Sequence, residues 1–368
     1  EGVESEVMGM REKLKTDWGF TGNGICLSAG PCSAESEEQV LTTARALAGR
    51  GVSFFRAGIW KPRTRPGGFD GVGPEGLDWL VRARAETGLK IGTEVAEPSH
   101  VEACLERGLD VLWVGARTTT NPFSVQAIAD ALKGVDVPVF VKNPMSADIG
   151  LWIGAIERLA NAGLTRLGAI HRGVSSSLEM RYRNAPAWKM PIEFMRRFPE
   201  TPIICDPSHI CGKADLIPAI AQEAMDLLFD GLMIEVHPDP AGALSDAAQQ
   251  LTPERFVSLI ENLELPSEKS DSAAFMNRMS ELRGAVDEID SQLLELIGGR
   301  MEIVREMGRL KTELNVSTLQ PDRWREILVD RVRKGVALDL SEDFVLQVMQ
   351  SIHEEAIRLQ ERERVGVE

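Results

Sequence analysis

The sequence lacks any apolar run that approaches the roughly 20 residues of a membrane-spanning helix. It also lacks an excess of positive charge, because 41 lysines and arginines stand against 56 aspartates and glutamates, which gives a net charge of -15. Such a balance disfavours nonspecific binding to nucleic acid or to anionic membranes. We therefore expect neither of these partners. An anionic ligand would need a local cluster of arginines and lysines.

Cysteine is scarce as well. The five cysteines are an odd number, lie between Cys26 and Cys211, and do not resemble the framework of a secreted, disulfide-rich protein. This usage fits a reducing compartment. No signal-peptide pattern opens the chain, although Glu1 stands in place of an initiator methionine. We therefore expect a cytoplasmic protein.

Proline and glycine become rare after residue 266, since only 1 of the 19 prolines and 6 of the 33 glycines lie beyond it. A chain of 368 residues also exceeds the roughly 250 to 300 residues at which a single hydrophobic core stops growing. The residues around the change are small and polar, as linkers are. The predicted organisation is an N-terminal extension at residues 1–24, an α/β domain at 25–264, a linker at 265–274 and a helical domain at 275–368.

In the first domain, short runs rich in Val, Ile and Phe alternate with helical patterns, which indicates βαβ units and a parallel sheet. The runs lie at residues 25–28, 53–55, 90–95, 111–114, 137–141, 166–170, 202–205 and 232–236. Eight such units in about 240 residues predict a (β/α)8 TIM barrel. An open, doubly wound sheet is the competing architecture.

The second domain is helical throughout. Apolar side chains recur at spacings of three and four from Met279 to Met307, apart from one skipped turn, and predict one long helix. Two shorter helices follow, near residues 321–334 and 341–362. A long helix with one apolar stripe cannot bury that stripe alone, so we expect this domain to form a homodimer or a higher homo-oligomer.

Residues with metal-binding chemistry follow several predicted strands, at the barrel face where active sites are built. A thiolate, an imidazole and two carboxylates are good ligands for a divalent transition metal. Cys32, His209, Glu235 and Asp246 fit that description. Cys205 and Cys211 flank His209 and form a competing cluster, but their neighbours do not repeat a zinc-finger spacing.

Cationic residues gather at the same strand ends, in a protein that is otherwise acidic. They are Arg56, Lys61, Arg63, Arg117, Lys142 and Arg172. Guanidinium groups match phosphate and carboxylate oxygens, and lysine adds a mobile charge. The cluster predicts a strongly anionic substrate. The alternative is that individual members are solvated or pair with Glu94 and Asp206.

A family resemblance is carried by the motifs GPCSAES, FRAGIWKPRT, TEV, GARTTTNPF, VKN, HRG, DPSH, EVHP and ALSDAAQQL, in this order. Over residues 24–263 the chain resembles type I 3-deoxy-D-arabino-heptulosonate 7-phosphate (DAHP) synthase of the β subgroup. The resemblance implies condensation of phosphoenolpyruvate with erythrose 4-phosphate, the entry to the shikimate pathway of aromatic amino-acid biosynthesis. A related alternative is 3-deoxy-D-manno-octulosonate 8-phosphate synthase, which uses arabinose 5-phosphate.

The resemblance also implies roles for individual residues. Cys32, His209, Glu235 and Asp246 match the metal ligands, with Mn²⁺ expected and Zn²⁺, Fe²⁺ or Co²⁺ as alternatives. The phosphoenolpyruvate site matches Arg56, Lys61, Arg117, Lys142 and Arg172, and the erythrose 4-phosphate site matches Arg63 and Thr64. Lys61, His209 and Glu94 are the candidates for proton transfer. Arg65 departs from the pattern of the family.

In the long helix, Arg300 and Lys311 are eleven residues apart and share a face, about 20° apart around the axis. Arg283 lies about 100° from Arg300, so it would join the same pocket most easily from a partner chain. The competing interpretation is a solvated basic stripe.

Residues 275–364 resemble the all-helical AroQ-class chorismate mutase. The resemblance is carried by Leu282, Arg283, Asp290, Arg300, Lys311, Arg323 and Gln360. It implies rearrangement of chorismate to prephenate in a helix-swapped dimer, where Lys311 and Gln360 donate to the ether oxygen and Arg283, Arg300 and Arg323 hold the ligand. Trp324, in place of a glutamate, and the mid-helix pair Gly298–Gly299 depart from the family. The contrasting hypothesis is a dimerisation or ligand-sensing module through which prephenate or chorismate inhibits the barrel.

Overall fold

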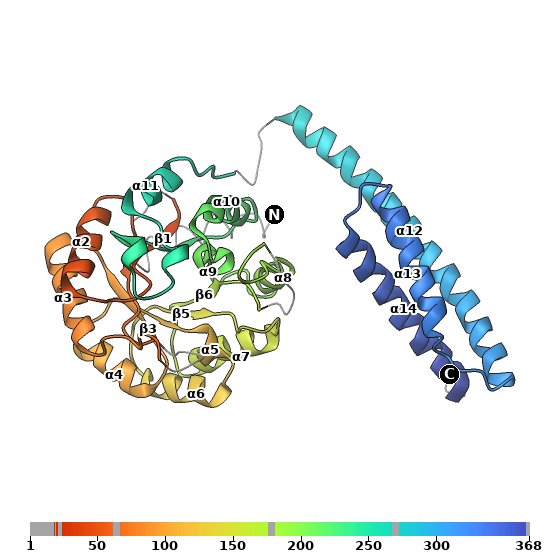
Figure 1. The fold of residues 1–368 in the computed structure, drawn as a ribbon, viewed down its shortest axis with the longest axis horizontal. Helices are drawn as coiled ribbons and strands as arrows, with labels where there is room; N and C mark the ends of the chain where they lie inside the picture. Colours follow the sequence, from red (N-terminus) through yellow and green to blue (C-terminus); the bar gives the residue numbers. More distant parts are fainter. Residues whose placement is uncertain are drawn as a thin grey trace. The chain divides into compact units, whose positions relative to one another are not determined.

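The computed structural model describes residues 18, 20, 24–61, 67–175, 181–266 and 272–365. The chain divides into two compact units, Glu1–Pro266 and Ser267–Glu368. Figure 1 shows an α/β barrel in the first unit and helices alone in the second. No helix of the described part is both long and apolar enough to cross a membrane.

Eight parallel strands form a closed barrel in the first unit, in the order of the sequence (Figure 1). They are β1 (Cys26–Gly30), β2 (Phe54–Arg56), β3 (Ile91–Val95), β4 (Val111–Val114), β5 (Val139–Lys142), β6 (Leu167–His171), β7 (Ile203–Cys205) and β8 (Gly231–Glu235). β8 pairs with β1 from Cys26↔Gly231 to Gly30↔Glu235, and this pairing closes the sheet. The predicted TIM barrel is confirmed, and the open sheet is excluded.

Helices surround the barrel. They are α2 (Glu37–Leu47), α3 (Glu75–Thr87), α4 (Pro98–Glu106), α5 (Ala116–Thr119), α6 (Pro122–Ala131), α7 (Ile149–Asn161), α8 (Lys189–Arg197), α9 (Pro207–Cys211), α10 (Ile217–Asp226) and α11 (Pro253–Glu261). Three 3₁₀ turns lie at Ala214–Leu216, Pro240–Gly242 and Ala247–Gln249. Ser36, Asp148 and Thr252 accept hydrogen bonds from the first turns of α2, α7 and α11, as N-capping residues do.

The buried side chains form two clusters in this unit. The larger cluster includes the strand residues Leu27, Val114 and Val141 together with residues of the surrounding helices. The smaller cluster joins strand residues such as Phe54 and Phe140 to Trp18 and Phe20 of the N-terminal segment. The Trp18 and Phe140 rings meet edge to face, with centroids 5.3 Å apart. The strands are therefore covered by apolar residues on both faces, as parallel strands require.

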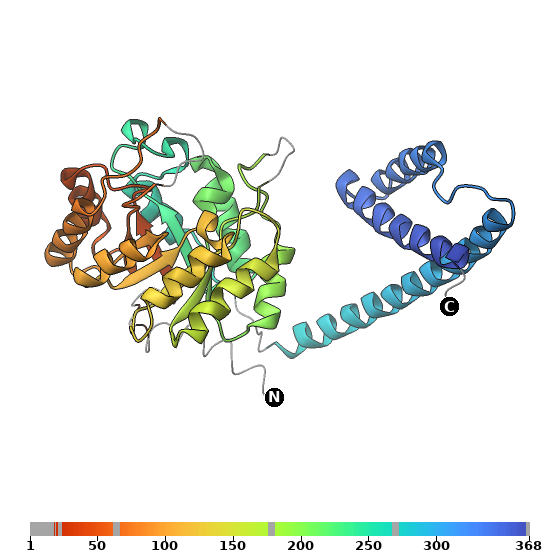
Figure 2. The ribbon, with the colours of Figure 1, turned by 90° about the horizontal axis from the view of Figure 1, so that it is seen from below.

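The second unit contains α12 (Ala273–Glu313), α13 (Pro321–Val336) and α14 (Glu342–Val365). Its small core joins Met301 and Val304 of α12 to Ala356 and Leu359 of α14. Figure 2 shows α14 against the later part of α12, and α13 packs on α14. In the earlier part, apolar side chains are about half exposed, and they include Leu282, Val286, Ile289 and Leu293. Among the described residues of this unit, nothing therefore covers the first half of the stripe.

Candidate functional site

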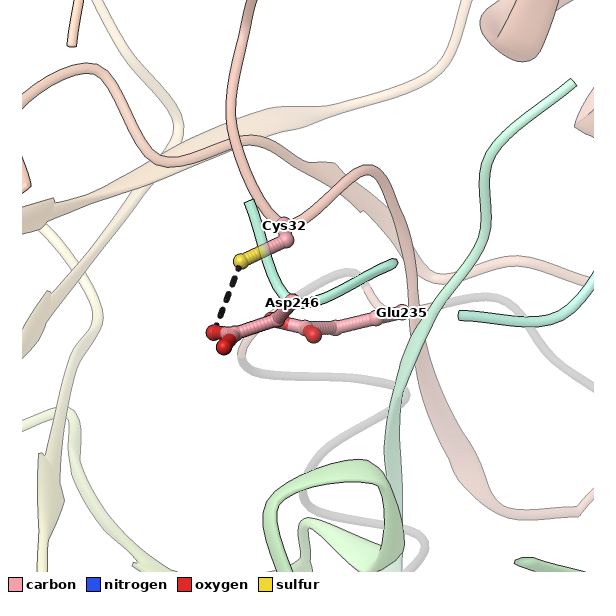
Figure 3. Close-up of side chains that lie close together, drawn as sticks. All are labelled: Cys32, Glu235 and Asp246. Atoms are coloured by element: carbon pink, nitrogen blue, oxygen red, sulfur yellow. Dashed lines mark hydrogen bonds between the residues drawn. The ribbon is translucent and has the colours of Figure 1, made fainter. Parts of the chain in front are cut away.

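Cys32, Glu235 and Asp246 converge at the carboxyl ends of the strands (Figure 3). Cys32 follows β1, Glu235 ends β8, and Asp246 lies in the loop after β8. One ligand atom from each residue lies within 4.8 Å of the others, and Cys32 Sγ is 3.3 Å from Asp246 Oδ2. Asp246 has a φ of 47°, a left-handed conformation uncommon outside glycine. The fold thus brings three of the four predicted metal ligands into one cluster.

His209, the fourth predicted ligand, approaches the cluster from α9. Its Nε2 atom lies 3.7 Å from Glu235 Oε1, and its Nδ1 atom lies 2.8 Å from Asp206 Oδ2. Asp206 is completely buried and was considered from the sequence only as an ion-pair partner. A carboxylate on one ring nitrogen fixes the orientation of the imidazole and leaves the other nitrogen to face Glu235.

The charges around the cluster fit a divalent cation. Burial, followed by the charge of Glu235, raises the pKa of the Cys32 thiol to about 12. Burial alone would raise the pKa of Asp246, but His209 and Arg183 hold it below its usual value. A thiol and two carboxylates so close together repel one another when all are ionised, and a bound cation removes that repulsion. The donor set matches a transition metal such as Mn²⁺, Zn²⁺, Fe²⁺ or Co²⁺.

Two predicted cations lie against the ligands themselves. Arg56 Nη1 is 3.2 Å from Glu235 Oε1, and Arg56 Nη2 donates to the backbone carbonyl of Cys32 over 2.9 Å. Its guanidinium also lies over the Trp113 ring, 5.2 Å from the centroid. Lys61 Nζ is 2.9 Å from Cys32 Sγ. Both cations therefore border the proposed metal position.

A second group of cations lies at the ends of β5 and β6. Lys142 Nζ is 2.7 Å from Asp206 Oδ2, and both side chains are buried. Arg172 follows β6 and is 5% exposed, and its Nη1 atom has no hydrogen-bond partner in the described part of the chain. Burial, with the neighbouring charges of Arg183 and Arg117, lowers the pKa of Arg172 to about 10. A buried arginine with an unsatisfied donor is suited to an anionic ligand.

The structure describes only some of the remaining predicted barrel residues. Glu94 lies in β3, and its side chain accepts a hydrogen bond from Trp113 Nε1 over 3.0 Å. Arg117 lies in α5 and is exposed. Arg63, Thr64 and Arg65 lie outside the described residues.

Two neighbouring glutamines hold the ligand residues, a role that the sequence reasoning missed. Gln249 Nε2 donates to Glu235 Oε2 over 2.7 Å, and its Oε1 accepts from Arg183 Nη1 over 2.6 Å. Gln250 Oε1 accepts from the backbone N–H of Cys32 over 2.9 Å. The only signal in the sequence was their place in ALSDAAQQL, three and four residues after Asp246.

The helical unit brings together part of the predicted chorismate site. Arg300 Nη1 and Gln360 Oε1 are buried and lack hydrogen-bond partners among the described residues. Lys311 Nζ donates to the Thr318 carbonyl over 2.7 Å, and partial burial lowers its pKa. Arg323 is exposed, with Nη1 3.0 Å from Glu326 on its own helix. Gly298 and Gly299 are exposed and do not interrupt α12.

The exposed Arg283 lies far along α12 from this pocket. It is seventeen residues before Arg300, which corresponds to about 25 Å of helix at 1.5 Å per residue. The two side chains therefore cannot meet around one ligand while α12 stays continuous.

A closed eight-stranded barrel with a candidate metal cluster and buried cations at the carboxyl ends of its strands defines a TIM-barrel enzyme. The sequence profile of the DAHP synthetase I family matches residues 15–268, and that of chorismate mutase type II matches residues 282–361. The chain belongs to the DAHP synthetase I family and carries a chorismate mutase domain after the barrel.

Individual relatives include both a heptonate aldolase and an octonate aldolase. A phospho-2-dehydro-3-deoxyheptonate aldolase from Thermotoga maritima is 32% identical over 243 residues, which cover 66% of this chain and 70% of the relative. A crystal structure of the T. maritima DAHP synthase matches with a TM-score of 0.58 and 30% identity, over 72% of each chain. A 2-dehydro-3-deoxyphosphooctonate aldolase from Syntrophotalea carbinolica is 30% identical, over 66% of this chain and 91% of the relative.

Proposed function

We propose that the barrel condenses phosphoenolpyruvate with erythrose 4-phosphate and water to give DAHP and inorganic phosphate, and that the helical unit rearranges chorismate to prephenate. The observation that carries the first activity is the convergence of Cys32, Glu235 and Asp246 with Arg56 and Lys61 at one end of the barrel. In the reaction, C3 of phosphoenolpyruvate attacks the aldehyde carbon, water adds at C2, and phosphate leaves.

Cys32, His209, Glu235 and Asp246 would hold the divalent ion, for which Mn²⁺ is our first choice. A bound ion supplies Lewis-acid polarisation of the aldehyde oxygen. Lys61 lies against Cys32 and would stabilise negative charge that develops at the same oxygen. Glu94 and His209 are further candidates for moving protons at the aldehyde and at the attacking water.

The cations at the strand ends would hold phosphoenolpyruvate. Arg172 offers a buried, unsatisfied donor, and Lys142 and Arg56 are buried cations with one carboxylate partner each. Phosphoenolpyruvate and an aldose phosphate repel each other in water, so fixed cations between them lower the cost of bringing the reacting carbons together. Arg117 would complete this group, and Arg63 with Thr64 would bind the aldose phosphate.

The choice of aldose phosphate tests the assignment directly. We expect phosphoenolpyruvate to be consumed with erythrose 4-phosphate and to remain with arabinose 5-phosphate, measured by its ultraviolet absorbance. Consumption with arabinose 5-phosphate alone would instead assign the barrel as a 3-deoxy-D-manno-octulosonate 8-phosphate synthase.

For the helical unit, the buried polar groups of Arg300 and Gln360 support a site for chorismate. The rearrangement is pericyclic and needs no nucleophile, so restraint of the ligand and fixed charges suffice. The half-exposed stripe of Leu282, Val286 and Ile289 supports a homodimer in which α12 of a second copy covers it and supplies Arg283. The contrasting function is a ligand-sensing module without turnover.

The cysteines support a location in the cytoplasm. Cys26, Cys32, Cys104, Cys205 and Cys211 are all buried free thiols, which suits a reducing compartment.

A further inference from the structure

Three polar atoms of the helical unit are buried without a hydrogen-bond partner among the described residues. They are Arg300 Nη1, His353 Nε2 and Gln360 Oε1. Arg300 and Gln360 belong to the proposed chorismate site, whereas His353 has no role so far. Buried polar atoms are nearly always hydrogen-bonded in a complete structure, so three in one small unit point to a ligand that supplies the bonds.

The packing of α14 on α12 places His353 beside the proposed site. His353 and Gln360 are seven residues apart, two turns of helix, and therefore lie on one face of α14. Gly308 of α12 fits closely against Gln360, since a Cβ added there would lie 3.1 Å from Gln360 Cα. The Arg309–Glu363 ion pair of 2.8 Å extends the same register. Arg300 lies eight residues before Gly308 on α12, and His353 lies seven residues before Gln360 on α14. The same register therefore places His353 at the level of Arg300.

The charges around His353 agree with this placement. Burial lowers the pKa of His353, and Arg300 and Lys311 of α12 lower it further. Glu354, next to it on α14, acts weakly in the opposite direction. The imidazole is therefore neutral at pH 7 and lies within the field of the two cations that would bind an anionic ligand.

Trp324 of α13 fixes the ring of His353. The two rings are stacked, with centroids 3.8 Å apart and planes 6° apart. Stacking holds the plane of the imidazole while leaving its edge, with Nε2, available for a hydrogen bond. An indole has one donor and no acceptor, so Trp324 itself cannot accept a hydrogen bond from a ligand hydroxyl.

We propose that His353 is a ligand-binding residue of the helical unit, positioned by Trp324, and that its Nε2 atom binds an oxygen of a cyclic dicarboxylate held by Arg300 and Lys311. This inference rests on the proposed chorismate site. It adds a second polar contact from α14, beside Gln360, to a pocket whose two cations come from α12.

The test is calorimetric titration of the full-length protein with prephenate. His353→Phe keeps an aromatic ring for Trp324 but removes Nε2, and we expect affinity to fall about three- to tenfold, the usual effect of one hydrogen bond. His353→Gln restores a polar group and should recover part of the loss. His100→Gln is the matched control, because His100 stacks on Trp60 in the barrel with the same 3.8 Å and 6° geometry. This control should bind prephenate like the wild type.

A pH series measures how prephenate affinity depends on pH, and a purely structural role of His353 would leave that dependence unchanged. An anionic ligand offsets the cations and raises the pKa of His353, so wild-type affinity should strengthen between pH 8 and pH 6 by proton uptake. In His353→Gln this dependence should flatten. Unchanged affinity and an unchanged pH profile in His353→Gln, with normal circular dichroism, would overturn the inference.

Arg300→Ala separates this inference from the function on which it rests. Loss of prephenate binding in Arg300→Ala, with no effect of His353→Phe, would leave the proposed site standing and reject the role of His353. Wild-type binding and mutase turnover in Arg300→Ala would reject the proposed site itself.

Discussion

At the scale of single residues, the barrel site depends on one thiol among five. Cys32 is the only cysteine in the described part of the chain whose sulfur lies in the cluster with Glu235 and Asp246. Cys211 is also buried and lies two residues after His209 in the sequence, yet the cluster does not include it. The structure thus favours the Cys32 set over the competing arrangement around His209.

We predict that Cys32→Ser loses metal and synthase activity together. Loss of a direct ligand should weaken metal binding by at least about 100-fold, because even supporting residues around metal sites are worth 10- to 100-fold. Metal content after dialysis, measured by mass spectrometry, and the rate of phosphoenolpyruvate loss are the readouts. Chelation of the wild type should likewise stop the synthase and spare the mutase.

Cys211→Ser is the control for this prediction. It should keep both its metal and its synthase activity, since its sulfur is outside the cluster. The opposite pattern, with metal lost in Cys211→Ser and kept in Cys32→Ser, would move the metal site to the cysteines around His209. Full synthase activity in metal-free wild-type protein would reject the metal role altogether.

At the scale of elements, α12 extends well beyond the helix that packs against it. Its 41 residues extend well past the region where α14 packs, and the part beyond that region carries both the half-exposed apolar stripe and Arg283. A second copy that packs there would bury the stripe and bring Arg283 to a pocket that its own chain cannot reach. In the proposed dimer, a single helix would link dimerisation to the completion of the site.

We predict that Arg283→Ala and Lys311→Ala proteins, each inactive as a mutase, regain activity when mixed. With random exchange of subunits, half of the dimers are mixed and one of the two sites in each is intact. About a quarter of wild-type mutase activity should therefore return. Chorismate loss after exchange is the readout, and differently tagged chains show that exchange has occurred. No recovery despite exchange would mean that each site is built within one chain.

At the scale of the whole molecule, two activities of one biosynthetic route lie in a single chain, joined at residues around Pro266. An anionic ligand in the helical unit would neutralise Arg300 and Lys311 and could change how that unit interacts with the barrel. Such coupling requires a ligand that binds two conformations of the protein with different affinity. The coupling free energy is typically about 1 to 3 kcal/mol. The competing view is a tether between independent sites.

We predict that prephenate inhibits phosphoenolpyruvate consumption by the full-length protein several-fold or more. Arg300→Ala should retain the uninhibited synthase rate and lose the inhibition, because only the helical site is altered. Equal inhibition of wild type and variant would place the sensor in the barrel. Inhibition of neither would leave the tether as the role of the fusion.

The sequence alone was sufficient for the eight strands, the long helix and the order of the motifs. These features depend on local patterns: apolar runs bounded by turns, a repeat of three and four, and polar residues directly after strands. Cys32 and Glu235 could be placed at one face because the carboxyl ends of all eight strands meet there.

Only the tertiary structure decided which side-chain atoms meet. Gln249 joins Glu235 to Arg183, which is 66 residues away from it in the sequence, and Asp206 joins the nearby His209 to Lys142, which is 64 residues away from Asp206. The stack of Trp324 on His353 likewise depends on how α13 packs against α14. Such contacts are set by the packing of whole elements, so no local pattern in the chain specifies them.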